Sequence, residues 1–355
     1  MKFRSNDMRK STAQASSDVA LVKYWGKKDE VLRLPENGSI SMILKGLDTM
    51  TTVEFREDSE NSVTINGEHD DAEAERVLKH IERIKKIAVA KNVLSEEAAM
   101  KLRVNVASQN TFPKGTGLSS SGSGFAALTL AAVTALEMNL SSKELSILAR
   151  QGSGTACRCV LGGFVEWLDG DTSESSYSVS LHNAGHWDIR DVVAVVDKGK
   201  KRISSTEGHE SARSSPFYEA RLQRIKKKLV DVKAVLAEKD FAQLGELVEA
   251  EALEFHSILL TSQPSLIAWY PGTIEVMLAV QALRSEGILA YFTINTGFNV
   301  HVLTLPEYEE AVKERLSTLS LVKETLTASV GEAPRVIQDH LFQKTLCQQH
   351  QSTLP

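Results

Sequence analysis

The chain has 355 residues, of which 42% are hydrophobic and 25% charged, a composition typical of a globular protein with room for two domains. Its formal net charge of -5 argues against a nucleic-acid-binding protein, which needs clustered lysines and arginines to contact phosphates. The longest apolar stretch, 125–136, is too short to span a membrane, and the polar first residues do not resemble a signal peptide. Three cysteines, an odd number, suit a reducing compartment, and Cys157 and Cys159 have no second pair that would complete a zinc site. We therefore expect a cytoplasmic protein that holds no metal.

Hydrophobic patterns predict the elements of the first half of the chain. Strands are expected at 19–25, 39–44, 49–55 and 101–107. A charged amphipathic helix is expected at 70–91, where isoleucines recur at helical spacing. An uncharged helix is expected at 121–137. Another helix should run to about residue 151, starting from a capping box made by Ser141 and Glu144.

The second half changes to long helices. Strands are expected at 162–168, 192–196, 290–294 and 300–303, helices at 217–238 and 241–256, and a serine-rich loop at 204–216. Strands and helices in this order predict an α+β fold. We place the domain boundary between 185 and 200, so that residues 1–190 and 191–355 would form two domains.

A glycine- and serine-rich segment at 113–124 lies between a predicted strand and the uncharged helix. Glycines let successive N–H groups approach an anion, and the start of a helix adds partial positive charge. The segment has neither the Walker pattern nor the dinucleotide fingerprint. A flexible connector is the alternative, but the segment leads directly into an apolar helix and contains a lysine. We predict a phosphate-binding loop formed by Lys114, Gly115, Gly117 and Ser119.

Two cations are candidates for catalysis. Lys23 lies in an otherwise apolar segment, so it either has a function or extends its amine to the surface. Arg158 follows a glycine–serine turn, and its planar fork can hold a carboxylate or phosphate through two hydrogen bonds. On the residue pattern alone, a surface ion pair of Arg158 is equally consistent.

Several multi-residue motifs carry a family resemblance. The pattern from Pro113 to Ser121 resembles the phosphate loop of the galactokinase, homoserine kinase, mevalonate kinase and phosphomevalonate kinase (GHMP) superfamily. Segments 21–29, 34–41, 150–158 and 162–167 are similar to motifs of one branch, the diphosphomevalonate decarboxylases. The resemblance covers residues 13–300. It implies a domain like ribosomal protein S5 domain 2, a ferredoxin-like C-terminal domain, an active site between them and a homodimer.

The resemblance also implies a reaction and residue roles. In this family ATP phosphorylates the 3-hydroxyl of a mevalonate phosphate, after which phosphate and carbon dioxide leave together. Lys23 and Arg158 are the implied catalytic residues, Arg158 by holding the substrate carboxylate. The implied substrate-binding residues are Tyr24, Trp25, Lys27, Ser120, Ser121, Ser153, Gly154, Thr155 and Asn295. Of these, Tyr24 and Lys27 would hold the 5-phosphate end.

The chain departs from the family pattern at one catalytic position. ATP-dependent members carry an aspartate at the start of an Asp-Ala-Gly-Pro-Asn turn, and the matching residue here is Asn295. That aspartate orients or deprotonates the 3-hydroxyl, and an amide cannot accept a proton at neutral pH. The chain could therefore be a degenerate ATP-dependent decarboxylase, a 3-kinase, or an enzyme whose substrate arrives already phosphorylated on the 3-hydroxyl. Family 3-kinases lack the lysine that is present here as Lys23.

Our prediction from sequence is the third case. It is the ATP-independent conversion of mevalonate 3,5-bisphosphate to isopentenyl phosphate, phosphate and carbon dioxide without a cofactor, as in mevalonate 3,5-bisphosphate decarboxylases. A second departure favours it, because Asp18 replaces the asparagine of a Pro-Val-Asn-Ile-Ala motif and adds negative charge near the expected phosphates. The intact phosphate loop favours the alternative, an ATP- and Mg²⁺-dependent phosphomevalonate or diphosphomevalonate decarboxylase. A non-catalytic sensor of phosphorylated mevalonates is disfavoured because Lys23 and Arg158 are both present.

Overall fold

The computed structural model describes residues 9–57, 60–199 and 205–342, so Cys347 lies outside the described residues. The strands are β1 (Arg9–Val22), β2 (Lys27–Asp29), β3 (Leu34–Pro35), β4 (Ser39–Arg56), β5 (Ser62–Ile65), β6 (Arg103–Asn110), β7 (Phe164–Trp167), β8 (Ser178–His182), β9 (Arg190–Val195), β10 (Ala290–Thr293), β11 (Val300–Thr304), β12 (Glu324–Val330) and β13 (Arg335–Ile337). The helices are α1 (Asp71–Ala90), α2 (Glu96–Lys101), α3 (Ser120–Ala135), α4 (Ser142–Gly152), α5 (Ala156–Cys159), α6 (Ser205–Ser211), α7 (Tyr218–Glu238), α8 (Phe241–Thr261), α9 (Pro271–Ser285) and α10 (Glu309–Ser317), with short 3₁₀ turns at Ala212–Ser214 and Pro306–Tyr308.

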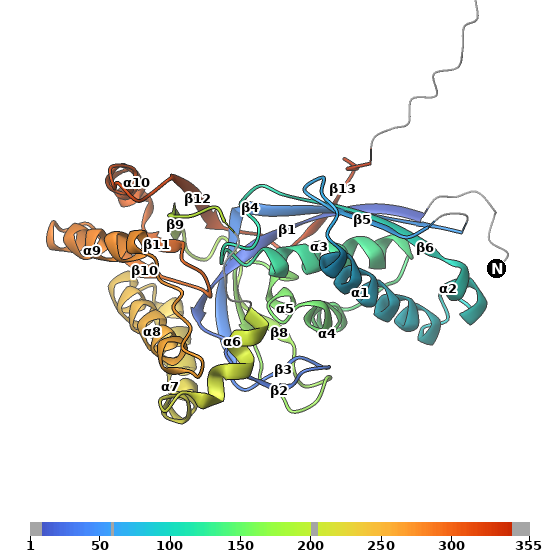
Figure 1. Cartoon of the computed structure of the whole chain (residues 1–355), viewed down its shortest axis with the longest axis horizontal. Helices are drawn as coiled ribbons and strands as arrows, with labels where there is room; N and C mark the ends of the chain where they lie inside the picture. The colour runs from blue at the N-terminus through green and yellow to red at the C-terminus, as the bar shows by residue number, and fades with distance from the viewer. Residues whose placement is uncertain (1–8, 58–59, 200–204, 343–355) are drawn as a thin grey trace, which may run out of the picture.

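One large mixed sheet runs through both halves of the molecule, in the order β10-β11-β9-β12-β4-β1-β13 (Figure 1). Strand β4 joins the halves, because its first part pairs with β7 and β12 and its second part with β6. The two strands predicted at 39–44 and 49–55 are thus one long strand. It changes direction at Gly46, whose φ of +107° suits glycine and where an added Cβ atom would lie 2.9 Å from the Thr327 carbonyl oxygen.

In the first half, helices α1, α3 and α4 cover one face of the sheet (Figure 1). Helix α3 carries no charged residue, and most of its side chains are buried against β1, β4, α1 and α5. A helix that is apolar all round belongs in the interior of a domain. Its rigid position matters for the site, because its N-terminus follows the phosphate loop.

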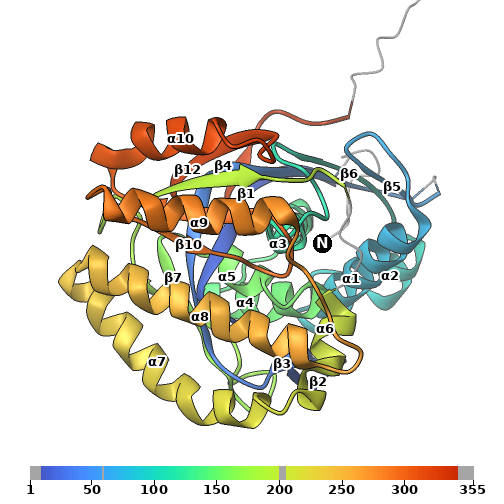
Figure 2. The ribbon, with the colours of Figure 1, turned by 60° about the vertical axis from the view of Figure 1, so that its left-hand side comes forward.

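In the second half, helices cover both faces of the sheet, with α7 and α8 on one side of β10 and α9 and α10 on the other (Figure 2). Successive side chains of β9 point to opposite faces of the sheet, because a strand has a two-residue period. Val193 and Val195 pack in the core with α7 and α8, whereas Val192 and Ala194 pack with α9 and α10. Both faces of β9 are buried over residues 192–195, which explains why these four residues are all apolar.

The predicted α+β class is confirmed, and most predicted elements occur within a few residues of their expected bounds. The loop prediction at 204–216 is wrong for the described residues, which form α6 and a 3₁₀ turn. Serine and glycine are poor helix formers, but α6 is stabilised by packing of His209 against the rings of Tyr24 and Trp25. Helices α2, α5, α9 and α10 and strands β2, β3, β5, β8, β12 and β13 were not predicted. Among the helices that the structure describes, none is long and apolar enough to cross a membrane.

Candidate active site

A pocket of about 420 Å³ lies where the two halves meet. It is lined by β1 and the turn after it, the phosphate loop, the turn before α5, helix α6 and the turn after β10. Every site residue predicted from the sequence lines this pocket: Lys23, Tyr24, Trp25, Lys27, Lys114, Gly115, Gly117, Ser119, Ser120, Ser121, Ser153, Gly154, Thr155, Arg158 and Asn295. The fold therefore brings together segments that are up to 272 residues apart, as between Lys23 and Asn295.

Two irregularities in β1 place its polar side chains in the pocket. The register with β4 shifts between Ser16 and Ser17 and again between Ala20 and Val22. A β-bulge changes the direction of the following side chains and is common beside active sites. Asp18 lies between the two shifts, and Lys23 follows the second. Both side chains point into the pocket although their residues are at least 97% buried.

The Lys23 ammonium lies at the centre of a hydrogen-bonded group. Its Nζ donates to the carbonyl oxygen of Ala20 and to Thr293 Oγ1, each at 2.7 Å, and to Asn295 Oδ1 at 3.1 Å. Burial lowers the pKa of Lys23 to about 7, and the carboxylate of Glu251 opposes this shift. Near neutral pH the Lys23 side chain can therefore exchange readily between its ammonium and neutral amine forms.

A buried ion pair holds the backbone of Lys23 from the other half of the molecule. Glu251 Oε1 on α8 accepts the Lys23 N–H at 2.9 Å, and Arg221 on α7 donates to the Lys23 carbonyl oxygen at 3.0 Å. The two side chains also bond to each other at 2.6 Å. Although burial raises the pKa of Glu251, Arg221 and Lys228 together bring it down to about 2. Residues outside the pocket thus fix the position of the candidate catalytic lysine.

Asp18 forms an ion pair with Arg158. The Nε and Nη2 atoms of Arg158 lie 2.9 and 2.7 Å from Asp18 Oδ2, and Nη1 donates to Ser39 Oγ at 2.6 Å. Ser119 Oγ donates to the other oxygen of Asp18 at 2.6 Å. Burial alone would raise the pKa of Asp18, but Arg158 and Ser119 hold it below its ordinary value. The negative charge expected to face the phosphates is therefore compensated by Arg158.

The phosphate loop packs directly against the turn that carries Asn295. A Cβ atom at Gly117, whose φ is +97°, would lie 2.6 Å from the Cα of Gly297. Ser119, the N-cap of α3, has a left-handed φ of 57°. The side chain of Asn299 donates to the carbonyl oxygen of Thr116 at 3.4 Å. The glycines permit this close approach, which brings the N-terminus of α3 next to Asn295.

Tyr24 and Lys27 both line the pocket. The Tyr24 hydroxyl is buried and has no hydrogen-bond partner among the described residues, so a ligand oxygen could accept from it. Lys27 Nζ pairs with Glu30 at 2.6 Å. Ser153 Oγ donates to Ser121 Oγ at 3.3 Å, which joins the turn before α5 to the start of α3. Trp25 lines the pocket, but its ring is almost fully buried between His209 and Phe255.

The structure adds site residues that the sequence did not indicate. Arg33, Arg76, Glu73 and His209 also line the pocket. Arg76 lies on the charged face of α1, which looks like an ordinary solvated helix face in the sequence. His209 lies in the stretch predicted to be a loop. Arg33 has a left-handed φ of 53°, and no local sequence pattern predicts that it lines the pocket.

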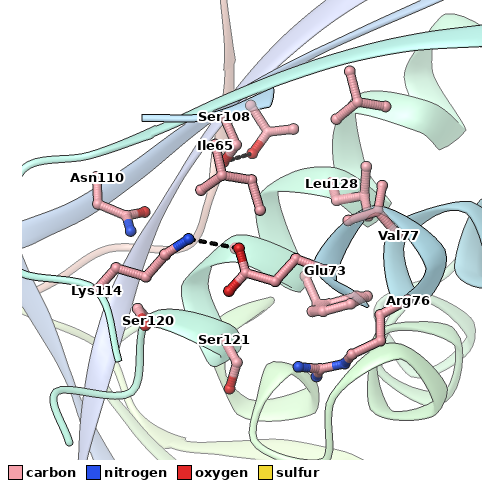
Figure 3. Close-up of a pocket in the computed structure, with 14 residues that line it drawn as sticks. Ile65, Glu73, Arg76, Val77, Ser108, Asn110, Lys114, Ser120, Ser121 and Leu128 are labelled. Carbon is pink, nitrogen blue, oxygen red and sulfur yellow. Dashed lines mark hydrogen bonds and ion pairs between the residues drawn. The ribbon is translucent and has the colours of Figure 1, made fainter. Parts of the chain in front are cut away.

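A second cavity continues from the pocket between α1 and α3 (Figure 3). Both cavities are lined by Glu73, Arg76, Lys114, Ser120 and Ser121, so they meet at the phosphate loop. The far walls are apolar, formed by Ile65, Val77, Val106, Phe125 and Leu128, with the polar side chains of Ser108 and Asn110 on one side. The ion pair between Lys114 and Glu73, at 2.5 Å, lies at the junction. The second cavity has a volume of about 80 Å³, so an apolar group that enters it from the phosphate loop would lie partly outside it.

The described residues offer little for a metal ion by themselves. Within 9–57, 60–199 and 205–342, no three His, Cys, Asp or Glu side chains are grouped so that they could hold one. A magnesium ion in such a site takes most of its ligands from substrate phosphates and water. Asp18 and the serine hydroxyls of the phosphate loop line the pocket and are oxygen groups that could contribute to such a site.

Comparison with known families covers nearly the whole chain. Residues 15–178 match the diphosphomevalonate decarboxylase-like N-terminal domain, and residues 191–352 match the mevalonate 5-diphosphate decarboxylase C-terminal domain. A phosphomevalonate decarboxylase of Haloferax volcanii is 32% identical over 93% of this chain and 98% of its own length. The diphosphomevalonate decarboxylase of Debaryomyces hansenii is 33% identical over 85% of this chain and 81% of its own.

Solved structures agree with the sequence matches. The mevalonate diphosphate decarboxylase of Staphylococcus aureus superposes with a TM-score of 0.85 at 33% identity, over 94% of this chain and 99% of its own. A structure of MDDEF in complex with MVAPP, AMPPCP and magnesium has the same TM-score at 35% identity, over 94% of this chain and 100% of its own. The predicted GHMP-type fold is thereby confirmed. The chain belongs to the diphosphomevalonate decarboxylase family.

Proposed function

We propose that this chain is an ATP-dependent decarboxylase of a 5-phosphorylated mevalonate. The observation that carries the proposal is the second cavity, which leads from the phosphate loop to apolar walls between α1 and α3. ATP has a flat base and a ribose joined to phosphates, and the cavity, which is about 80 Å³ and continuous with the active-site pocket, would receive part of the base. A bisphosphate substrate, which needs no ATP, would leave the second cavity without a ligand. The ATP-dependent alternative is thus preferred over the ATP-independent reaction that we predicted from the sequence.

In this proposal the phosphate loop and the start of α3 receive the triphosphate. The N-terminus of α3 and the loop N–H groups attract the transferred phosphate, and Lys114 adds a positive charge on the side of the second cavity. Magnesium, bound with the nucleotide, would neutralise developing charge on the phosphates. Ser120 and Ser121 supply hydroxyl donors beside the helix terminus, whereas the Ser119 hydroxyl already donates to Asp18.

The elimination step needs cations beside the substrate. Departure of the 3-phosphate builds positive charge on carbon 3, while the carboxylate supplies the electrons and leaves as carbon dioxide. The Lys23 ammonium would stabilise the departing phosphate, and Arg158 would orient the carboxylate through the N–H groups that Asp18 and Ser39 do not use. Tyr24 and Lys27 would hold the 5-phosphate.

An amide at position 295 is compatible with this chemistry. Phosphoryl transfer passes through a loose transition state, so positioning and charge stabilisation contribute more than proton abstraction. The Oδ1 atom of Asn295 is already an acceptor, for Lys23 at 3.1 Å, and could accept a substrate hydroxyl in the same way. The loss of a general base would slow the first step, by about 10²- to 10⁴-fold at most.

The second candidate function is the ATP-independent decarboxylation of mevalonate 3,5-bisphosphate. The observation that favours it is the same Lys23–Asn295 contact, since the turn after β10 offers an amide and no carboxylate to activate a hydroxyl. Lys23 and Arg158, which serve the elimination, are both in place. The two candidates differ in whether the second cavity is used.

Gly124 provides a test of the second cavity. It lines the cavity from α3, and a Cβ atom added there would have no neighbour within 4 Å. Gly124→Leu should fill the cavity and raise the KM for ATP at least tenfold, whereas Gly124→Ala, the matched control, should leave it nearly unchanged. Both substitutions favour the helix, so unfolding does not confuse the result. If Gly124→Leu turned over substrate with an unchanged KM for ATP, the nucleotide would not bind there, and the proposal would fail.

A further inference from the structure

His256 joins helix α8 to the turn after β10, which carries Asn295. The histidine is 1% exposed, and its Nε2 atom lies 3.0 Å from the carbonyl oxygen of Asn295. A carbonyl oxygen can only accept, so Nε2 carries the proton and donates. The same residue, Asn295, accepts from the Lys23 ammonium through its side chain. His256 is not among the described residues that line the pocket, so its effect on the reaction must pass through this turn.

The ring of His256 is held in place by its neighbours. It packs edge-on against Phe255, with 5.1 Å between the ring centroids, and lies 5.2 Å from the ring of Trp269. Burial lowers the pKa of His256 to about 3, and the Lys23 ammonium acts in the same direction, while two backbone carbonyl groups oppose the shift. The imidazole is therefore neutral near pH 7. A neutral donor can hold the turn beside Lys23 without adding a second positive charge.

Helix α8 holds both partners of the Lys23–Asn295 hydrogen bond by their main chains. Glu251 accepts the Lys23 N–H at 2.9 Å, and His256 donates to the Asn295 carbonyl oxygen. Both side chains come from one helix, which lies beside β10 (Figure 2). Their Cα atoms are separated by only about 7.5 Å of helix, a rigid distance. The separation of the two main-chain segments is thus fixed from outside the pocket.

The position of the turn also matters for the phosphate loop. A Cβ atom at Gly117 would lie 2.6 Å from the Cα of Gly297, so the loop and the turn are in close contact. A displaced turn would therefore move Asn295 relative to both Lys23 and the loop. An apolar side chain of similar size could fill the space of the His256 ring. It would leave the Asn295 carbonyl oxygen without this donor.

We propose that His256 is a positioning residue, which fixes the main chain of Asn295 so that the Asn295 Oδ1 atom faces the Lys23 ammonium. Without the His256 N–H group the turn gains freedom, and the hydrogen bond between Oδ1 and Lys23 Nζ is formed less often. The ammonium then loses one of its three described acceptors. The inference rests on the proposed function for the role of Lys23 in the elimination step.

Two substitutions at position 256 test the proposal through kcat. His256→Leu removes the donor at a similar volume, whereas His256→Gln is the conservative variant, because its amide keeps an N–H group. We expect His256→Leu to lower kcat by about 10- to 10²-fold, the scale of a small misplacement caused from outside the site. The KM values for the substrate and ATP should change by less than about threefold, since no binding group is removed. His256→Gln should recover most of kcat.

The pH profile gives a second measurement, which a purely structural role would not change. The protonated form of Lys23 serves the elimination, so kcat/KM should fall as the pH rises through the pKa of Lys23, about 7. In His256→Leu this falling limb should move to lower pH by roughly one unit, because the ammonium is stabilised by one hydrogen bond fewer. In His256→Gln the limb should return towards its position in the natural chain.

His186 provides a matched control. Its Nε2 also bonds to a main-chain carbonyl oxygen, that of Leu236, at 2.9 Å, and it is not among the described pocket residues. His186→Leu should lower the free energy of unfolding and leave both kcat and the falling limb unchanged. The Asn295→Ala background is a further control. If His256 acts through the Asn295 side chain, His256→Leu should no longer move the limb in that background.

The proposal would be overturned by a limb that stays in place in His256→Leu, by equal losses of kcat in the Leu and Gln variants, or by an equal shift of the limb in the Asn295→Ala background. Should His256→Leu fail to fold, His256→Met, whose flexible side chain adapts to the same space, replaces it.

The choice of substrate separates this proposal from the proposed function. Carbon dioxide release is measured with 5-phosphomevalonate or its diphosphate plus ATP and Mg²⁺, and separately with mevalonate 3,5-bisphosphate alone. If the natural chain turned over only the bisphosphate, ATP dependence would be wrong, and the variants would be compared on that substrate. If ATP were required and the limb of His256→Leu did not move, the role of His256 would be wrong and the proposed function would stand.

Discussion

Lys23 Nζ donates a 3.1 Å hydrogen bond to Asn295 Oδ1, which joins the end of β1 to the turn after β10. The acceptor is neutral, so this contact orients the ammonium without raising its affinity for protons as a carboxylate would. Two further acceptors at 2.7 Å complete the tetrahedral surroundings of the nitrogen. The geometry thus keeps the lysine in place with a pKa close to neutral.

The first prediction concerns pH. The charged neighbours of Lys23 are Glu251 and Asp18, which raise its pKa, and Arg158 and Arg221, which lower it, with burial lowering it most, to about 7. Since the protonated form serves the departing phosphate, kcat/KM, which reports the free enzyme, should fall as pH rises through about 7. The pKa of Lys23 in the folded chain lies below its ordinary value of 10.5, so burial of the ammonium destabilises the fold below pH 7. This destabilisation is lost as the pH rises from 7 to 10.5.

The variant Asn295→Asp checks this assignment. A carboxylate at hydrogen-bond distance should raise the pKa of Lys23, by about one unit or more, and move the falling limb of the profile to higher pH. If the falling limb of the pH profile of Asn295→Asp stayed at the same pH, a group other than Lys23 would cause it.

The second prediction concerns the Tyr24 hydroxyl. Tyr24→Phe should leave the free energy of unfolding nearly unchanged, because the hydroxyl has no partner among the described residues. It should raise the KM for the phosphorylated substrate about tenfold or more, the scale of a hydrogen bond to a charged group. The matched control is Tyr218→Phe, whose hydroxyl donates to the Trp25 carbonyl oxygen at 3.1 Å. It should cost about 1 kcal/mol of stability and leave KM unchanged. If Tyr24→Phe lowered the stability and left KM unchanged, whereas Tyr218→Phe raised KM, Tyr24 would not bind the substrate.

The third prediction concerns the Glu251–Arg221 ion pair, which holds the backbone of Lys23. Glu251→Gln leaves Arg221 and Lys228 without their buried anion and should reduce the free energy of unfolding at pH 7 by about 3 kcal/mol. The pKa of Glu251 is depressed to about 2 from 4.5, so its stabilisation is present above pH 4.5 and lost as pH falls towards 2. Denaturant titrations at pH 7 and pH 3 measure this, and the natural chain and the variant should differ less at pH 3.

Glu249 offers a matched control on the same helix, since it pairs with Arg284 at 2.8 Å. Its carboxylate also accepts the Phe292 N–H at 3.2 Å, and no hydrogen bond joins it to Lys23 among the described residues. Glu249→Gln should therefore leave kcat nearly unchanged, whereas Glu251→Gln should lower it. Equal effects of the two variants on kcat would contradict a positioning role of Glu251.

The fourth prediction concerns Arg158. Arg158→Ala should reduce kcat/KM by roughly 3 kcal/mol of transition-state stabilisation or more, and should also destabilise the fold, because Asp18 is left buried without its cation. Removing both charges, in Arg158→Ala with Asp18→Asn, should restore part of the stability but none of the activity. Thermal unfolding and steady-state kinetics on the same three proteins separate the two effects. A near-neutral effect of Arg158→Ala on kcat/KM would exclude Arg158 from the site.

Local sequence signals predicted much of this structure. The capping box of α4 forms as expected, with Ser141 and Glu144 exchanging hydrogen bonds. Apolar spacing predicted α1 and α3, and the motifs predicted which segments line the pocket. These features depend on residues that are close in sequence or on multi-residue patterns, which a single chain displays directly.

Long-range relationships could not be predicted in this way. Asp18 was expected to face phosphates, but Arg158, 140 residues away, compensates its charge. That β4 is one strand and not the two predicted ones depends on Gly46, whose φ of +107° allows the close approach of β12. Arg76 and His209 belong to the pocket because of how α1 and α6 pack, and their sequences resemble ordinary solvated segments. Tertiary contacts of this kind have no local signature.

The most direct test of the account is the nucleotide requirement of the natural chain. Carbon dioxide release should be measured from 5-phosphomevalonate and its diphosphate, each with and without ATP and Mg²⁺, and from mevalonate 3,5-bisphosphate without nucleotide. An ATP-dependent decarboxylase should release carbon dioxide from a 5-phosphorylated mevalonate only when ATP is present, with one phosphate and one ADP formed for each carbon dioxide. Rapid release from the bisphosphate alone, with no ATP-dependent release from the other two substrates, would contradict it.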